Sequence, residues 1–341
     1  MANTLRIRPC EPPDLSACAR LLAARHRRDR QRLPWLEPAF EDPLQAASWL
    51  AETTASPFSD GVIAEDNGSV VGFLVGQRLL LPPTDISAQF VPPRTVSIGV
   101  GGHAVAADSD PTTVYRAMYA ELAARWVAAG LFTHRVAIVP GDRAVEEAWV
   151  SLGFGRAMTA ATRRTADPVE ATVPAGVEIG TATPSDLDAV VALSDELAAH
   201  HWRAPMFWPV LAETSASARQ LFAAALASEV PCFLALERGQ PVGMQLFLDP
   251  GFTPPIVDRR HRLYLFEGVV SAAARGGGIG SALLAASMRW ARERGHELCT
   301  LHWAAANYSG APFWLGHGFV PVEHTMERRV DDRVTWARPR T

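Results

Sequence analysis

Tyr264–Leu284 has the sequence YLFEGVVSAAARGGGIGSALL, and this segment indicates how the second half of the chain folds. Tyr264–Val270 is typical of a β-strand, Arg275–Gly280 is a glycine-rich loop, and the apolar pattern that begins at Ile279 predicts a helix. The first turn of such a helix presents unpaired N–H groups, and glycine lets the main chain approach a ligand closely. The segment therefore predicts a site for an anionic group such as a pyrophosphate.

The helix after the loop is expected to be amphipathic. Ile279, Leu283, Ala286 and Trp290 recur at helical spacing, and Gly295 stands where a left-handed C-terminal cap is expected. One face of the helix should therefore pack on a sheet. The loop lacks the Gly-x-Gly-x-x-Gly pattern and the Gly-Lys-Ser/Thr pattern, which argues against a nicotinamide cofactor and against ATP.

The chain contains an internal repeat whose separation falls from 172 to 165 residues. The matching segments are Pro12–Leu15 with Pro184–Leu187, Val62–Phe73 with Phe233–Met244, and Trp149–Phe154 with Trp314–Phe319. We expect a duplication with a small insertion in the first copy, in the proline-rich segment Leu80–Arg94. Residues 166–176 have the composition of a linker.

Each copy is expected to fold as strand, helix pair, hairpin, strand, helix, strand, helix and strand. This order predicts an α/β (α+β) fold in which a mixed central sheet is flanked by helices. The predicted domains are residues 1–165 and residues 177–341. The length of 341 residues also favours two domains.

Composition and charge narrow the classes of partner. The 32 basic and 36 acidic residues leave no basic excess, so we expect no nucleic-acid partner. No window approaches eighteen uninterrupted apolar residues, and the start of the chain lacks a signal-like segment, so we expect no membrane and a cytoplasmic location. Cys10, Cys18, Cys232 and Cys299 lack metal-ligand spacing, and we expect free thiols and no metal. A monomer or homodimer is expected.

Two motifs in the second copy resemble those of the GNAT superfamily of N-acetyltransferases. Arg275-x-x-Gly278-x-Gly280, five residues after Val270, resembles the acetyl-CoA pyrophosphate loop of that family. The segment Asn307-x-x-Gly310-x-x-x-Trp314-x-x-x-Gly318-Phe319 resembles its second motif, usually Asn-x-x-Ala-x-x-x-Tyr-x-x-x-Gly-Phe. The resemblance covers residues 177–341 with both motifs, and the first half by repeat and fold order only. It implies two tandem GNAT-like acyl-CoA N-acyltransferase domains.

The resemblance also implies acetyl-CoA as co-substrate and the residues that hold it. The pantetheine arm is expected to pair with main-chain groups of Val269, Val270 and Ser271. The pyrophosphate is expected to lie on the loop and first helical turn, comprising Arg275, Gly276, Gly277, Gly278, Ile279, Gly280 and Ser281. Asn307, Phe313 and Trp314 are expected along the same cleft, although core packing is an equally good interpretation of Phe313 and Trp314.

In this family an amine attacks the thioester directly, so a nearby base must take a proton from the ammonium group. Glu267, on the strand before the loop, is the first candidate, and His302 on the next strand is its competitor. Many family members carry a tyrosine, thought to protonate the leaving thiolate, where this chain has Trp314. Tyr308 is the candidate that remains for that step.

The acceptor is expected to be a small-molecule amine that contacts His200, His201, Trp202 and Arg203. The predicted function is acetyl transfer from acetyl-CoA to that amine. Two alternatives remain, an acyl-CoA-binding sensor without turnover and a tandem GNAT-like aminoacyltransferase. The Arg275 loop and the absence of a basic excess argue against the aminoacyltransferase, and turnover of acetyl-CoA with an amine panel separates the sensor from the enzyme.

The first copy is expected to be degenerate as a coenzyme site. At the separation of 165 residues, Arg275–Gly280 falls on Asp110–Tyr115, and every feature of the anion site is replaced. Asp110 would repel a phosphate, Pro111 has no N–H, and Tyr115 fills the space that glycine leaves open. We therefore predict that this copy does not bind acetyl-CoA in the manner of the family.

Overall fold

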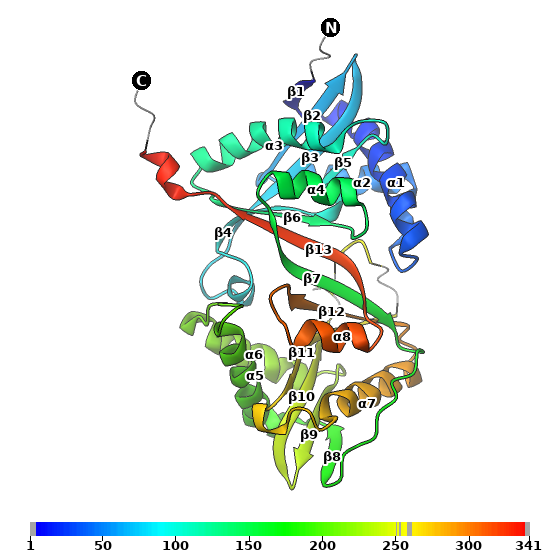
Figure 1. The fold of residues 1–341 in the computed structure, drawn as a ribbon, viewed down its shortest axis with the longest axis vertical. Helices are drawn as coiled ribbons and strands as arrows, with labels where there is room; N and C mark the ends of the chain where they lie inside the picture. Colours follow the sequence, from blue (N-terminus) through cyan, green and yellow to red (C-terminus); the bar gives the residue numbers. More distant parts are fainter. Residues whose placement is uncertain (1–4, 250, 252–253, 258–260, 338–341) are drawn as a thin grey trace.

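The computed structural model describes residues 5–249, 251, 254–257 and 261–337 (Figure 1). The first half contains β1 (Arg6–Pro9), α1 (Leu15–Arg32), α2 (Pro43–Ala55), β2 (Ser59–Asp66), β3 (Ser69–Leu80), β4 (Arg94–Ile98), β5 (His103–Val105), α3 (Pro111–Ala128), β6 (Thr133–Ile138), α4 (Arg143–Ser151) and β7 (Gly155–Arg164). The second half contains β8 (Val177–Thr181), α5 (Leu187–Trp202), α6 (Ala212–Leu226), β9 (Cys232–Glu237), β10 (Gln240–Leu248), β11 (Arg262–Val270), α7 (Ile279–Glu293), β12 (Leu298–Ala304), α8 (Gly310–Gly316) and β13 (Val320–Arg329).

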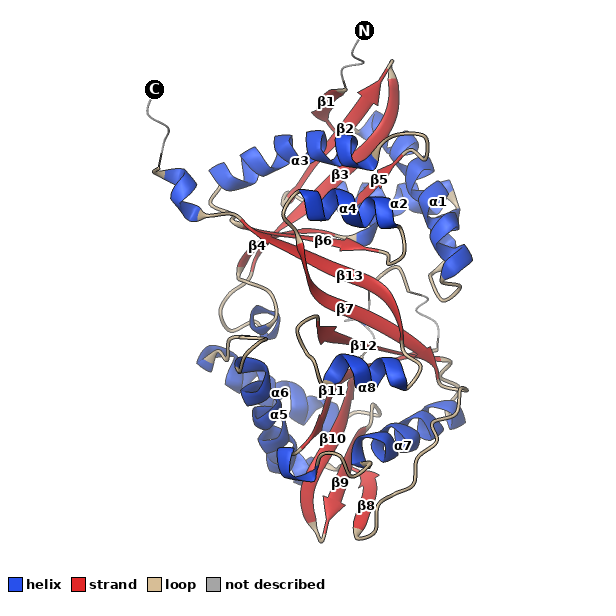
Figure 2. Ribbon diagram, in the orientation of Figure 1, coloured by secondary structure: helices blue, strands red, loops and turns tan. Residues whose placement is uncertain are grey.

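Both halves have the predicted order of elements, and the mixed sheet flanked by helices is confirmed (Figure 2). One difference separates them. The strand that is continuous as β11 in the second half is interrupted in the first half by Val100–Gly102, which separates β4 from β5. This interruption concerns the candidate site, because the uninterrupted strand of the second half, β11, carries Glu267.

The two halves share one continuous sheet because their last strands are exchanged. The strand order of the described residues is β1-β2-β3-β4-β6-β13-β7-β12-β11-β10-β9-β8. Strand β7 of the first half pairs with β12 of the second, and β13 of the second half pairs with β6 of the first. Both exchanged strands cross the middle of the molecule in Figure 1. The division at residues 1–165 and 177–341 stays a prediction, since neither half completes its own sheet.

Local sequence explains the hairpins and the long helix. The β2–β3 turn places Asn67 and Gly68 at positive φ, and the β9–β10 turn does the same with Arg238 and Gly239. Positive φ at both turn residues is the geometry of the tight hairpin turns predicted there. Helix α7 ends before Gly295, whose φ of 77° confirms the predicted left-handed cap.

Apolar clusters cover both faces of the sheet. In the first half, α3 and α4 cover one face and α1 and α2 the other. In the second half, α7 and α8 lie on one face, and α5 and α6 lie on the other. The sheet with its helices is therefore the scaffold on which the loops at the strand ends are held.

The proline-rich segment between β3 and β4 docks on the second half. The hydroxyl of Thr214, on α6, donates to Gln89 Oε1 at 2.6 Å, and Ser217 Oγ donates to the carbonyl of Thr84 at 2.9 Å. These bonds bring a loop of the first half to the cavity described below. No helix among the described residues is both long and apolar enough to cross a membrane.

Candidate functional site

Strands β11 and β12 separate at the centre of the second half. They pair in parallel from Arg262 with Leu298 to Leu265 with Leu301, and β11 then continues to Val270 without β12 as a neighbour. Strand β12 therefore does not cover the edge of β11 at Val269 and Val270, where an extended ligand could pair. A cavity of about 830 Å³ opens at this gap and extends to the start of α7.

The loop before α7 has the geometry predicted for an anion site. Gly276 and Gly278 have φ of 82° and 87°, in the left-handed region that favours glycine. Gly278 is the N-cap of α7 and offers no side chain to the first-turn amides. Residues 276–278 are exposed, and Gly276 and Gly278 line the cavity. A negative group placed there would meet several N–H donors and the positive end of the helix dipole.

Two side chains fix the ends of this loop. Arg275 Nε donates to the carbonyl of Val270 at 2.9 Å, which ties the loop to the end of β11. Glu196, on α5, accepts from Ser271 Oγ and from the amide of Ala272, both at 2.7 Å. The hydrogen bond from Ser271 is the main cause that lowers the pKa of Glu196. The loop is thus anchored before any ligand is present.

Close contacts require glycine at two further positions. A Cβ on Gly268 would lie 3.1 Å from the Trp314 ring, and one on Gly280 would lie 3.3 Å from the Phe313 ring. Phe313 and Trp314 therefore pack against the β11 edge and the first turn of α7. Both rings also line the cavity, so their packing in the core is observed and their contact with a coenzyme stays a prediction.

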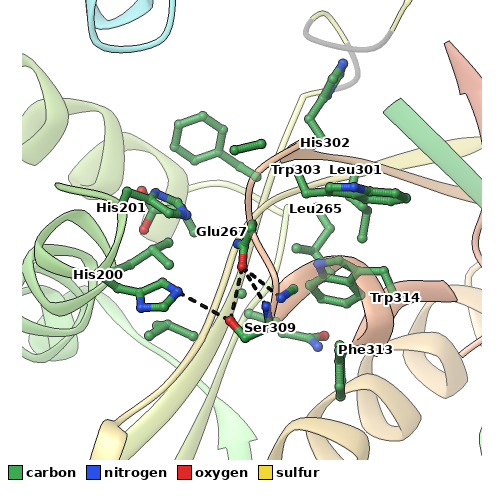
Figure 3. A pocket seen from close by; sticks show the side chains of 18 of the residues that line it. His200, His201, Leu265, Glu267, Leu301, His302, Trp303, Ser309, Phe313 and Trp314 are labelled. Atoms are coloured by element: carbon green, nitrogen blue, oxygen red, sulfur yellow. Dashed lines mark hydrogen bonds between the residues drawn. The ribbon is translucent and has the colours of Figure 1, made fainter. Parts of the chain in front are cut away.

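Glu267 lies in the cavity on the side of α5 (Figure 3). The register of β10 against β11 shifts at Phe266, so Leu246 faces Glu267 while Phe247 faces Leu265. Such a bulge redirects the side chains that follow it. Ser194 Oγ on α5 donates to Glu267 Oε1 at 3.1 Å, and Oε2 has no hydrogen-bond partner among the described residues. Burial raises the pKa of Glu267 to about 7, against the opposing effect of the Ser194 bond.

His302 lies on β12 and also lines the cavity. A hydrogen bond of 3.0 Å joins its Nδ1 to the hydroxyl of Tyr264. Burial lowers the pKa of His302 to about 4, so its imidazole is neutral at pH 7. His302 is therefore held by Tyr264, while Glu267 has one free carboxylate oxygen.

Asn307 and Ser309 shape the start of α8. Asn307 Oδ1 accepts from the amides of Ser309 and Gly310 and from Ser309 Oγ. Ser309 Oγ is also hydrogen-bonded to His200 Nε2 at 3.3 Å, which links α5 to α8 across the cavity (Figure 3). Tyr308 is 66% exposed, and its ring lies 6.3 Å from that of His200. Its role as proton donor stays a prediction.

Of the predicted acceptor segment His200–Arg203, one half lines the cavity and the other does not. His200 and His201 line the cavity, and Figure 3 shows both on the side of Glu267 opposite Trp314. Trp202 is 64% exposed, and neither Trp202 nor Arg203 is among the cavity-lining residues. For these two residues, contact with an acceptor stays a prediction.

Comparison with known proteins agrees with this geometry. Residues 195–319 match the acetyltransferase (GNAT) family. The chain carries a GNAT acetyltransferase domain. No curated protein matches the sequence significantly.

Two solved structures extend the likeness to the half outside that match. A GCN5-related N-acetyltransferase from Sphaerobacter thermophilus is similar over 95% of this chain and 95% of its own, with 16% identity and a TM-score of 0.54. The glucosamine N-acetyltransferase region of a fungal multi-domain GH3 β-N-acetylglucosaminidase is similar over 96% of this chain and 38% of its own, with 12% identity and a TM-score of 0.55. These likenesses show that the fold of both halves occurs in other proteins.

In the described part of the first half, side chains fill the place that corresponds to the start of α7. Asp110 caps α3 and accepts from the amides of Thr112 and Thr113, so a carboxylate takes the donors that α7 leaves free. Tyr115, which stands where α7 has Gly280, is fully buried. Its ring packs 4.9 Å from that of Trp149, and its hydroxyl is 2.7 Å from Nδ1 of buried His103. Side chains of this half therefore occupy the place of a ligand.

Tyr115→Ala is expected to lower the free energy of unfolding by about 3 to 5 kcal/mol, as for other large aromatic truncations in a core. Because the change lies in the first half, the affinity for acetyl-CoA should stay the same. Urea denaturation and isothermal calorimetry measure the two quantities. An affinity that changes with Tyr115 would contradict the structural role of this residue.

The sequence did not reveal several cavity residues. Ser194 lies in a segment without a motif, Ser309 occupies an unspecified position of the Asn307–Phe319 motif, and Phe90 and Arg135 come from the first half. The proline-rich segment was a signal for Phe90, since we predicted an insertion there, but nothing in its composition indicates where it docks. Arg135 reaches the cavity because β13 places β6 in the common sheet.

Proposed function

We propose that this protein is an N-acetyltransferase that transfers the acetyl group of acetyl-CoA to the amine of a small molecule. One observation carries the proposal: the uncapped start of α7 and the carboxylate of Glu267 open on the same cavity. The first feature suits a diphosphate and the second suits an ammonium group that must lose a proton.

The residues present fit the coenzyme. The amides of residues 276–281 would hold the pyrophosphate, because α7 has no side-chain cap and its N-cap glycine lies at positive φ. The edge of β11 at Val269 and Val270, which β12 does not cover, would bind the pantetheine arm as a neighbouring strand does. Asn307, Phe313 and Trp314 would border the arm on the other side of the gap.

Glu267 would act as the general base. When acetyl-CoA is bound, a bond forms between the amine nitrogen and the acetyl carbon, and the carbon–sulfur bond of the thioester breaks. Glu267 takes the ammonium proton, directly or through water, with the oxygen that Ser194 leaves free. A pKa near 7 suits this work, because the group is both substantially ionised and basic enough at neutral pH.

The departing thiolate has no tyrosine at the position that many family members use, since Trp314 occupies it. An indole N–H is not an acid of useful strength. A thiol with a pKa of about 8.5 is already a tolerable leaving group, so we infer that this step proceeds with water or with Tyr308, which is exposed next to the cavity-lining Asn307 and Ser309.

A turnover assay tests the proposal. The full-length protein is incubated with acetyl-CoA and a panel of primary amines, and free thiol is followed with a thiol reagent. We expect thiol release that depends on the amine. Binding of acetyl-CoA without amine-dependent thiol release would instead support a sensor that has no turnover.

A further inference from the structure

Aromatic rings from three separate segments border the cavity on the side of α5. Phe90 follows the docked loop of the first half, Trp208 lies between α5 and α6, and Phe266 lies on β11 beside Glu267. The ring of Phe90 is 5.7 Å from that of Trp208 and 6.1 Å from that of Phe266, in edge-to-face geometry at both contacts. All three side chains are half-buried, so part of each ring remains open to the cavity.

The position of Phe90 is fixed from outside the cavity. Its neighbour Gln89 accepts a hydrogen bond of 2.6 Å from Thr214, a residue that is 1% exposed on α6. Ser217, one turn further along α6, binds the carbonyl of Thr84. The loop is therefore held at both ends of its short 3-10 turn, Ile86–Gln89, and Phe90 is presented to the second half as part of a rigid wall.

Charge is sparse beside these rings. Among the described residues that line the cavity, Glu267 is the one acidic side chain. His201 packs against Trp208 with ring centroids 5.2 Å apart, and burial lowers its pKa to about 4, so it is neutral at pH 7. Two arginines also line the cavity, but Arg275 is bonded to the Val270 carbonyl and Arg135 is paired with Glu327. A ligand that enters on the side of α5 meets the three rings, the neutral imidazole of His201, the Glu267 carboxylate and the hydroxyl of Ser194.

We propose that the acceptor is a primary amine that carries an aromatic ring, and that Phe90 of the first half determines this specificity. The inference rests on the proposed function. An aryl group placed against the cavity side of Phe90, Trp208 and Phe266 would bury a large apolar area and make further edge-to-face contacts. Its amine would then point to Glu267, which neighbours Phe266 on β11. A polyhydroxylated amine would leave hydroxyls unpaired against the rings, which is unfavourable.

With this acceptor, every bond and proton in the acyl transfer is accounted for. Glu267 accepts one proton of the ammonium group, the amine nitrogen forms a bond to the acetyl carbon, and the thioester carbon–sulfur bond breaks. The nitrogen releases its second proton to solvent as the amide forms, and the departing thiolate takes a proton from solvent to leave as the thiol.

Steady-state kinetics with 2-phenylethylamine and glucosamine test the inference on the full-length protein. We expect kcat/KM for 2-phenylethylamine to exceed that for glucosamine by at least about tenfold. Phe90→Ala should raise KM for 2-phenylethylamine by about tenfold or more and leave the acetyl-CoA Kd unchanged. Phe58→Ala is the matched control, because Phe58 also belongs to the first half but is 50% exposed and does not line the cavity.

Phe90→Leu is a second variant in case Phe90→Ala destabilises the fold, since leucine keeps an apolar side chain and removes the ring. It should also raise KM for 2-phenylethylamine, with the Tm and acetyl-CoA affinity of the parent. Preference for glucosamine, or a KM that neither Phe90 variant changes, would overturn the inference and leave the proposed function standing. Coenzyme binding without thiol release from any amine would overturn the proposed function and, with it, this inference.

Discussion

Replacing Gly278 with valine is expected to weaken acetyl-CoA binding at least about tenfold. Gly278 has φ of 87° at the N-cap of α7, and a residue with a side chain pays about 1 to 2 kcal/mol in the left-handed region. A factor of ten corresponds to about 1.4 kcal/mol, so the affinity falls by this much if the loop of the free variant relaxes and the strained conformation must be restored on binding. The branched side chain would also block the approach of a phosphate to the first-turn amides. Isothermal calorimetry with acetyl-CoA measures the change.

Gly295→Val is the matched control for this prediction. Gly295 has φ of 77° at the other end of the same helix, and no atom lies within 4 Å of a Cβ added there. Both variants should lose similar stability through backbone strain, but only Gly278→Val should lose coenzyme affinity. Equal losses of affinity would show that the effect arises from a weakened α7 and not from the loop.

Replacing Glu267 with glutamine is expected to lower kcat by about 10² to 10⁴, the range in which a positioned general base contributes. Acetyl-CoA affinity should change little, because Glu267 faces α5 and Ser194 and lies away from the α7 loop. In the parent protein, kcat should rise with pH through about 7, since the carboxylate accepts the proton and the acid form does not. The Gln variant should lose this inflection.

Glu323→Gln is the control that distinguishes loss of the catalytic base from loss of any buried carboxyl group. Glu323 lies on β13, is 9% exposed, and has a pKa that burial also raises to about 7, but it does not line the cavity. Its replacement should leave both kcat and the pH profile of the parent. If the inflection of kcat near pH 7 were lost in Glu323→Gln and retained in Glu267→Gln, Glu267 would not be the base.

Local features of the fold were predictable because they depend on neighbouring residues. Positive φ at Asn67–Gly68 and at Gly295, and the amphipathic pattern of α7, follow from sequence separations of a few residues. The exchange of β7 and β13 did not follow from the sequence. A strand's alternation determines which of its faces is buried, but it does not determine the neighbouring strand, and β6 and β12 each offer an edge for antiparallel pairing.

Some features of the candidate site could likewise be predicted from the sequence, and others could not. Glycines reveal the anion loop, because a close approach and a positive φ need that residue type. The direction of Glu267 depends on a register shift at Phe266, and the wall formed by Phe90 depends on hydrogen bonds to α6 that join residues more than a hundred positions apart. Such contacts leave no pattern in a single sequence.

Calorimetric titration of the full-length protein with acetyl-CoA tests the central claim most directly. We expect saturable binding at one site per chain, with affinity that Gly278→Val weakens and Gly295→Val leaves unchanged. Absence of binding to the folded protein would contradict the assignment of the α7 loop as a coenzyme site. Two sites per chain would contradict the conclusion that Asp110 and Tyr115 close the corresponding place in the first half.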